Sequence, residues 1–245
     1  MLVRRSKSVL RPLALAVILA GTVVGCGGSS DTASSDSSGK DSGAGGTQAS
    51  AATRIESVNK TMRETSFSST GTTTAFEGAT QKTSWHPEQG CRMEVSGAPQ
   101  ADGGEMYCKD GTSYTSAPLF AAMLAQKGQQ ITVPDRLSDV YVSSETGGDC
   151  AAFFALSPTG EFAPGKDTTV DGRKAVAIDV SSGPANDTYF ISAEAPDHLL
   201  KQEASRDGKT STTTYTDFGK EMTISMPAED KTMTMAEFRT AIGAG

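Results

Sequence analysis

Residues 188–216, TYFISAEAPDHLLKQEASRDGKTSTTTYT, carry the pattern that decides the fold. Of three short runs, 188–193 and 211–216 are rich in Thr, Tyr, Phe and Ile, and 199–204 begins with two leucines; Pro, Asp and Gly lie between the runs. Such runs are typical of β-strands, and SRDG at 205–208 supplies an Asp-Gly turn between the last two. This stretch therefore predicts consecutive antiparallel strands.

Similar strand-like runs occur through most of the chain. Further strands are predicted at 66–76, 79–86, 91–96, 105–109, 112–116, 168–170, 174–180 and 221–225. Helical segments are predicted at 51–65, 117–127, 150–156 and 234–242. Ile55, Val58 and Met62 fall on one face of the first helix, as a 3.6-residue repeat requires.

The order of these elements is helix, strands, helical insert, then more strands. No strand–helix–strand alternation occurs, which argues against a parallel α/β sheet. We therefore predict an α+β fold in which a large, mostly antiparallel sheet carries its helices on one side.

The N-terminus has the pattern of a bacterial lipoprotein signal. Four basic residues precede a mostly apolar stretch at 12–24, which is too short to span a bilayer as a helix. The stretch ends in VVGC at 23–26, which resembles a lipobox, with small Gly25 before the expected cut. Acylation needs a thiolate nucleophile, which Cys26 supplies. We predict a signal peptide at 1–25 and an acylated Cys26.

The segment that follows Cys26 supports a membrane anchor. Residues 26–50 are almost entirely Gly, Ser, Thr, Ala and Asp, and cannot bury enough surface to offset the entropy of ordering. We predict a flexible tether there and a single domain at 51–245. Such a chain would sit on the extracytoplasmic face of the cell membrane, held by its N-terminal lipid.

Charge excludes some classes of partner. The chain has 22 basic and 29 acidic residues, and four basic residues leave with the signal, so the mature net charge is 18 − 29 = −11. An acidic domain without a basic run is a poor candidate for binding nucleic acid.

Three cysteines remain after Cys26, which predicts one disulfide and one free thiol outside the cytoplasm. A hairpin centred near residues 99–100 would place Cys91 opposite Cys108, as it would Met93 opposite Met106. Pairing with Cys150 would close a longer loop. The spacing does not choose among the three pairings.

Short motifs in the C-terminal third resemble actinobacterial lipoproteins of the LppX/LprG type, which are related in fold to the LolA lipoprotein carrier. They are PDHLLKQ at 196–202, YTDFG at 215–219 and MTI at 222–224 before Pro227, with DGTSYT at 110–115 upstream. The resemblance implies a half-barrel, a large curved sheet with helices on its concave side and an apolar cavity between them. It makes a lipid or acyl chain the expected ligand. The candidate cavity-lining residues are then Phe120, Met123, Leu124, Phe153 and Phe154.

Enzyme chemistry finds little support in the sequence. GEFAPGK at 160–166 has phosphate-loop spacing, but Asp167 stands where Ser or Thr would hold Mg²⁺. His86 and His198 have no partner at metal-ligand spacing, and no G-x-S-x-G elbow is present. Glu203 and Asp207 flank a turn rather than forming an acid–base pair. We expect no catalytic residue, no metal and no cofactor.

The leading hypothesis is a lipid-anchored protein that binds or carries an apolar ligand. The alternatives are an envelope interaction or structural protein with a filled core, and a hydrolase dependent on His86 or His198.

Overall fold

A computed structural model describes residues 50–97 and 103–243. The predicted signal peptide, Cys26 and the tether up to residue 49 lie outside the described residues. No helix in the described ranges is both long enough and apolar enough to cross a bilayer.

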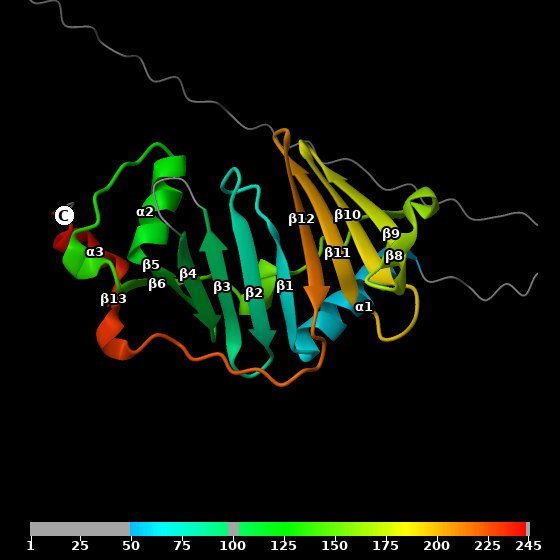
Figure 1. Cartoon of the computed structure of the whole chain (residues 1–245), viewed down its shortest axis with the longest axis horizontal. Coiled ribbons are helices and arrows are strands. Elements are labelled where there is room, and N and C mark those ends of the chain that lie inside the picture. Colours follow the sequence, from blue (N-terminus) through cyan, green and yellow to red (C-terminus); the bar gives the residue numbers. More distant parts are fainter. Residues whose placement is uncertain (1–49, 98–102, 244–245) are drawn as a thin grey trace, which may run out of the picture. The chain divides into compact units, whose positions relative to one another are not determined.

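The strands form one sheet that bends across the molecule (Figure 1). Within the described residues, the α-helices are α1 (Ala51–Glu64), α2 (Ala117–Gln126) and α3 (Met235–Ala241), and the 3₁₀ helices are η1 (Asp135–Leu137), η2 (Cys150–Phe153), η3 (Pro164–Lys166) and η4 (Glu229–Lys231). The strands of the first half are β1 (Phe67–Thr72), β2 (Thr80–His86), β3 (Gly90–Ser96), β4 (Gly103–Lys109), β5 (Thr112–Ser116) and β6 (Tyr141–Glu145). Those of the second half are β7 (Glu161–Phe162), β8 (Thr168–Val170), β9 (Arg173–Ser182), β10 (Ala185–Ser192), β11 (Leu199–Arg206), β12 (Lys209–Thr216) and β13 (Thr232–Thr234).

Two antiparallel meanders make up the sheet. The order is β13-β6-β5-β4-β3-β2-β1-β12-β11-β10-β9-β7, with β8 also on β9. The first and last strands of the two meanders, β1 and β12, pair antiparallel with Ser69 opposite Tyr215. All described pairings are antiparallel except that of β13 with β6. The predicted α+β class and the large, mostly antiparallel curved sheet are confirmed.

All three helices pack on the same face of this sheet, which we call the helical face. Phe67, Trp85, Cys91 and Cys108 lie opposite one another along β1 to β4, so their side chains point to one side. They share a buried cluster with α1, whose residues Ile55, Val58 and Met62 face the sheet as predicted.

Helix α2 covers the same face further along. Leu119 of α2 clusters with partly buried Met93 and Met106, which face each other two residues along from the cysteine pair, and with Val95, which lies four residues along. Even a Cβ atom on Gly104 would meet the Leu119 side chain at 2.5 Å, so α2 lies tightly on β4. The opposite face, which we call the open face, is covered near β9 by β8 and η3.

A disulfide joins Cys108 to Cys150, with the two Cα atoms 5.7 Å apart. Cys91 faces Cys108 across the β3–β4 hairpin, as the sequence predicted, but remains a free, buried thiol. Burial raises the pKa of the Cys91 thiol to about 11, against a smaller opposing effect from a backbone hydrogen bond at Cys108. The disulfide between Cys108 and Cys150 links η2 to the sheet, and Cys91 is left as a buried core residue.

One predicted strand is absent from the structure, and some observed strands were not predicted. Residues 221–225 form no strand; this segment is held instead by Gln89, which accepts a hydrogen bond from the Ile224 amide (2.7 Å) and donates one to the Met222 carbonyl (3.4 Å). Conversely, β7, β13 and β6 were not predicted, and the longest of these is β6. Its sequence YVSSE pairs with β5 because the preceding loop, buried at Leu137 and Val140, returns the chain to that edge.

We predict that Gly71→Ala destabilises the domain, because a Cβ atom at this position would lie 2.0 Å from the Thr212 carbonyl oxygen of β12. The expected loss in the free energy of unfolding is about 3 kcal/mol, as for other overpacked sites. Chemical denaturation measures it. Gly165→Ala is the control, since nothing lies within 4 Å of that position, and its change should stay within about 1 kcal/mol. Equal stability of the two variants would contradict the close β1–β12 approach.

Candidate ligand-binding site

An apolar groove of about 360 Å³ lies between α2 and α3. Phe120 and Leu124 reach it from α2 at i and i+4, which places both on one face of that helix. The loop after α2 and the face of α3 complete it; the remaining lining residues are Gln129, Ile131, Met235, Phe238, Arg239 and Ile242. The groove is therefore mostly apolar, with one amide and one guanidinium.

The floor of the groove is an aromatic pair. Phe238 of α3 is 1% exposed and meets Phe120 of α2 edge to face, with ring centroids 5.6 Å apart. Phe120, Ile131 and Ile242 are only partly buried against the same cluster. These side chains thus keep part of their apolar surface free at the groove, where contact with an apolar ligand would be favourable.

Side-chain caps, strand pairing and an arginine hydrogen bond hold α3 in place. Thr234 and Glu237 form a reciprocal capping box at its first turn: the Thr234 hydroxyl accepts from the Glu237 amide, and the Glu237 carboxylate accepts from the Thr234 amide at 2.7 Å. The preceding strand β13 pairs with β6, and Arg136 donates to the Ala241 carbonyl at 2.7 Å. The groove wall is therefore anchored at both ends of α3.

The five predicted cavity residues separate in space. Phe120 and Leu124 meet in the groove, whereas neighbouring Met123 is 40% exposed and does not line it. Phe154 packs into the core beside Trp85 and Phe67, with ring centroids 4.8 and 5.0 Å away, and Phe153 is 41% exposed. A shared role for all five in binding a ligand stays a prediction that the structure does not test.

Sequence reasoning missed the α3 half of the groove. Met235, Phe238 and Ile242 are spaced i, i+3 and i+7, which is the signal of an apolar helical face. That spacing was available in the predicted helix at 234–242. The local sequence pattern does not show that this helix packs near α2, which lies more than 100 residues earlier in the chain.

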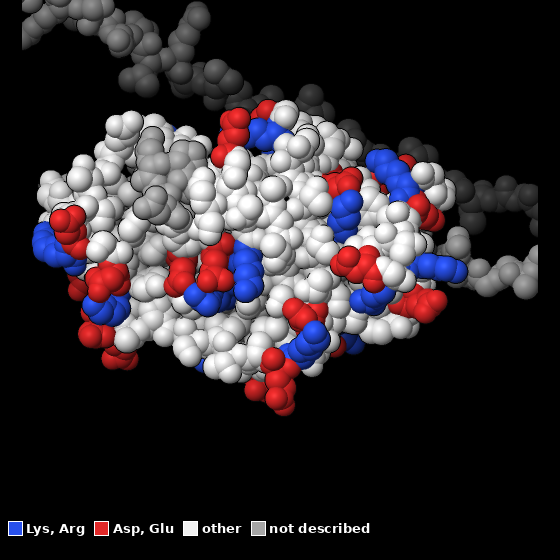
Figure 2. Space-filling model, in the orientation of Figure 1, with Lys and Arg blue, Asp and Glu red and all other residues white. Residues whose placement is uncertain are grey.

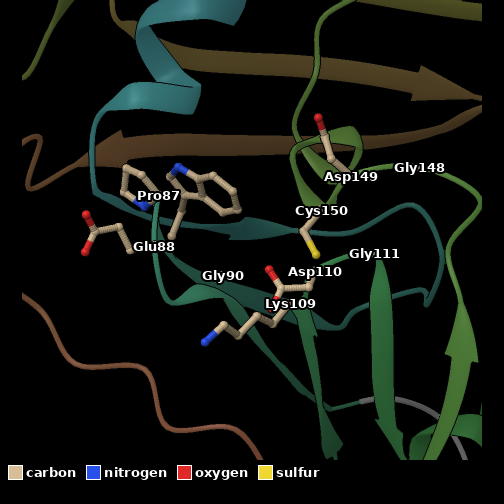
Figure 3. Close-up of a pocket in the computed structure, with 10 residues that line it drawn as sticks. Pro87, Glu88, Gly90, Lys109, Asp110, Gly111, Gly148, Asp149 and Cys150 are labelled. Atoms are coloured by element: carbon tan, nitrogen blue, oxygen red, sulfur yellow. The ribbon is translucent and has the colours of Figure 1, made fainter.

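A second pocket of about 390 Å³ lies at one end of the sheet, among the turns that include Pro87, Asp110 and Gly148 (Figure 3). Its walls include Trp85 and Cys150, both almost fully buried. The charged ends of Glu88, Lys109 and Asp149 point away from one another in Figure 3, and Asp149 is already paired with Arg63 at 2.8 Å. Because its polar groups do not converge, this pocket is a weaker candidate than the groove.

The phosphate-loop-like segment is part of the sheet edge. Glu161–Phe162 forms β7 against β9, and Lys166 is paired with Asp179 at 2.8 Å. Within the described residues, no group of three or more His, Cys, Asp or Glu side chains is placed to hold a metal ion.

His198 is a buried structural histidine. Its ring stacks on Phe218 with centroids 4.0 Å apart, and Arg173 Nη2 lies 3.2 Å from its Nδ1. Burial and the Arg173 charge lower the pKa of His198, and the Asp197 carboxylate opposes them. Arg54 holds Asp197 at 3.0 Å. These contacts favour a neutral imidazole that accepts a hydrogen bond from Arg173.

No protein-family model and no curated protein sequence matches the chain. Among solved structures, LprF from Mycobacterium bovis is 13% identical and matches 73% of this chain and 97% of its own, with a TM-score of 0.42. The lipoprotein LppX from Mycobacterium tuberculosis is 8% identical over 71% of this chain and 98% of its own, with a TM-score of 0.44. A LolA superfamily protein from Nitrosomonas europaea is 10% identical over 72% and 96%, with a TM-score of 0.29.

We predict that the domain loses stability between pH 7 and pH 5 through His198. Its folded pKa is lowered, so the unfolded chain binds the proton first as pH falls below the ordinary value of about 6.5. The expected slope is at most about 1.4 kcal/mol per pH unit. Denaturation midpoints across this range measure it. His198→Gln should flatten the slope, and a slope that this variant leaves unchanged would refute the assignment.

Proposed function

We propose that this protein is a lipid-anchored lipoprotein of the extracytoplasmic membrane face that binds, and carries or presents, an apolar ligand in the α2–α3 groove. The observation that carries the proposal is the groove itself, in which six apolar side chains from two helices and a loop converge on one concave surface. A volume of about 360 Å³ falls within the range of small-molecule sites.

The predicted anchor gives the groove a source of ligand. Acylation at Cys26 and a tether through residue 50 would keep the domain beside the bilayer. Random-coil scaling of such a segment allows a reach on the order of 25–30 Å. An apolar molecule leaving the membrane would then meet the domain within this distance.

A second candidate is an envelope interaction protein that uses the open face of the sheet. Arg92, Tyr107 and Tyr141 converge there on Glu105, and the two tyrosine hydroxyls donate to its carboxylate at 2.8 and 2.9 Å. Arg and Tyr are enriched where protein interfaces concentrate binding energy. The face seen in Figure 2 mixes Lys and Arg with Asp and Glu rather than gathering one sign, so a purely electrostatic partner is not favoured.

Ligand occupancy tests the groove. Protein purified from its own membrane should carry a bound apolar molecule in native mass spectrometry, and Leu124→Glu should reduce its occupancy roughly tenfold, because a carboxylate in an apolar site is costly to desolvate. Met123→Glu is the matched control, since Met123 is the adjacent, exposed residue of α2 outside the groove. Ligand-free wild-type protein would contradict the proposal and favour the interaction candidate.

The anchor is tested separately. We expect the N-terminal peptide of the mature protein to begin at Cys26 and to carry acyl chains in its mass. Cys26→Ser should abolish both the acyl mass and the cut before residue 26, whereas Cys91→Ser should retain them, because Cys91 is buried in the domain. An unmodified mature N-terminus at another residue would refute the anchor.

A further inference from the structure

We propose that the groove selects a single-chain amphiphile with an anionic head group, held by Arg239; this inference rests on the proposed function and names its ligand class. Arg239 is the one charged residue that lines the groove, on the same side of α3 as Met235 and Ile242.

The guanidinium is free to bind a ligand within the part of the chain that the structure describes. Arg239 makes no ion pair or side-chain hydrogen bond there, although nine ion pairs are formed among the described residues. The nearest acidic residue along α3, Glu237, is engaged with Thr234 in the capping box. Other described cations, such as Lys60 and Lys82, also lie outside these ion pairs; Arg239 differs from them in lining the apolar groove.

The position of the charge fits an amphiphile rather than a wholly apolar molecule. Arg239 is exposed, so its aliphatic stem can line the groove while its head stays in water. A chain packed over Phe238 and against Ile242 would leave its head group at this rim. The planar guanidinium offers paired donors that match a carboxylate or a phosphate.

The size of the groove limits the number of chains. A volume of about 360 Å³ lies near the lower end of the range for small-molecule sites, about 300–1,000 Å³. This space favours one acyl chain over a lipid with several. Gln129, the other polar lining residue, can donate an additional hydrogen bond through its amide.

The other places we considered carry less. The Glu105 cluster on the open face is already satisfied by Arg92 and two tyrosines. The pocket beside the disulfide has charged groups that diverge (Figure 3). Cys91 is a buried thiol with a raised pKa and makes a poor nucleophile.

Methyl NMR of the acylated full-length protein in nanodiscs tests the inference. The probes are decanoate, decyl phosphate and decanol at pH 7.5, where the carboxylate is ionised. Shifts of the Ile131, Met235 and Ile242 methyl groups report on the groove, and those of Ile55 and Met62 in the core should stay fixed. Each probe also partitions into the bilayer. Because this partition is the same for every variant, the affinities of the variants are compared for one probe at a time.

We expect Arg239→Gln to weaken both anions roughly fivefold to tenfold, as for loss of a charged hydrogen-bond donor, and to leave decanol unchanged. Arg239→Lys should bind the two anions with intermediate affinity, because lysine keeps the positive charge but lacks the paired donors of the planar guanidinium. Lys60→Gln is the matched control, an equal change of charge at an exposed position on α1. If both anions bind, the site accepts either a carboxylate or a phosphate head group. If only one of them binds, that anion identifies the head group.

Two results would overturn the inference in distinguishable ways. If Arg239→Gln weakens decanol as much as the anions, or Lys60→Gln acts like Arg239→Gln, the groove binds apolar chains without recognising the head group, and the proposed function stands alone. If no probe moves the three groove methyl groups of the wild-type protein, the groove binds no such chain, and both the inference and the proposed site fail.

Discussion

The pairing of β1 with β12 is the constraint on which the rest of the structure depends. These strands are about 140 residues apart in sequence, yet their backbones meet closely enough that Gly71 has no room for a Cβ atom. Through this one seam, two meanders that each have an incomplete core become a single curved sheet. Only then does Phe67 lie beside both Trp85 and Tyr215, and the helical face becomes continuous enough for α1 to cover.

Different helices cover different parts of the helical face. Helix α1 and the disulfide-tethered η2 close a well-filled region, where Phe154 packs between Phe67 and Trp85. Helices α2 and α3 cover the β4–β6 end less completely, since their facing side chains keep apolar surface at a groove. This difference in coverage explains why two phenylalanines have different environments: Phe154 packs in a core, whereas Phe120 lines a groove.

The proposed activity joins features that lie far apart in the chain. The predicted acyl anchor and tether would bring the domain to the bilayer, and the groove offers a surface complementary to a chain drawn from it. Arg239 adds a polar end to that surface. As proposed, these parts would hold an apolar molecule and orient it, while His198 and Glu105 make contacts within the domain.

Local pattern was enough to predict the α+β class, most strands, the α1 core face and the facing of Cys91 with Cys108, because period, turn residues and hairpin symmetry are short-range properties. Local pattern was not enough for β6, for the loss of the strand at 221–225, or for the α3 half of the groove, since each depends on a partner distant in sequence. The disulfide shows the division most clearly. Sequence alone predicted one disulfide and one free thiol among the three cysteines that follow Cys26. Only the tertiary structure decided which, by bringing η2 over the helical face so that Cys150, rather than Cys91, bonds to Cys108.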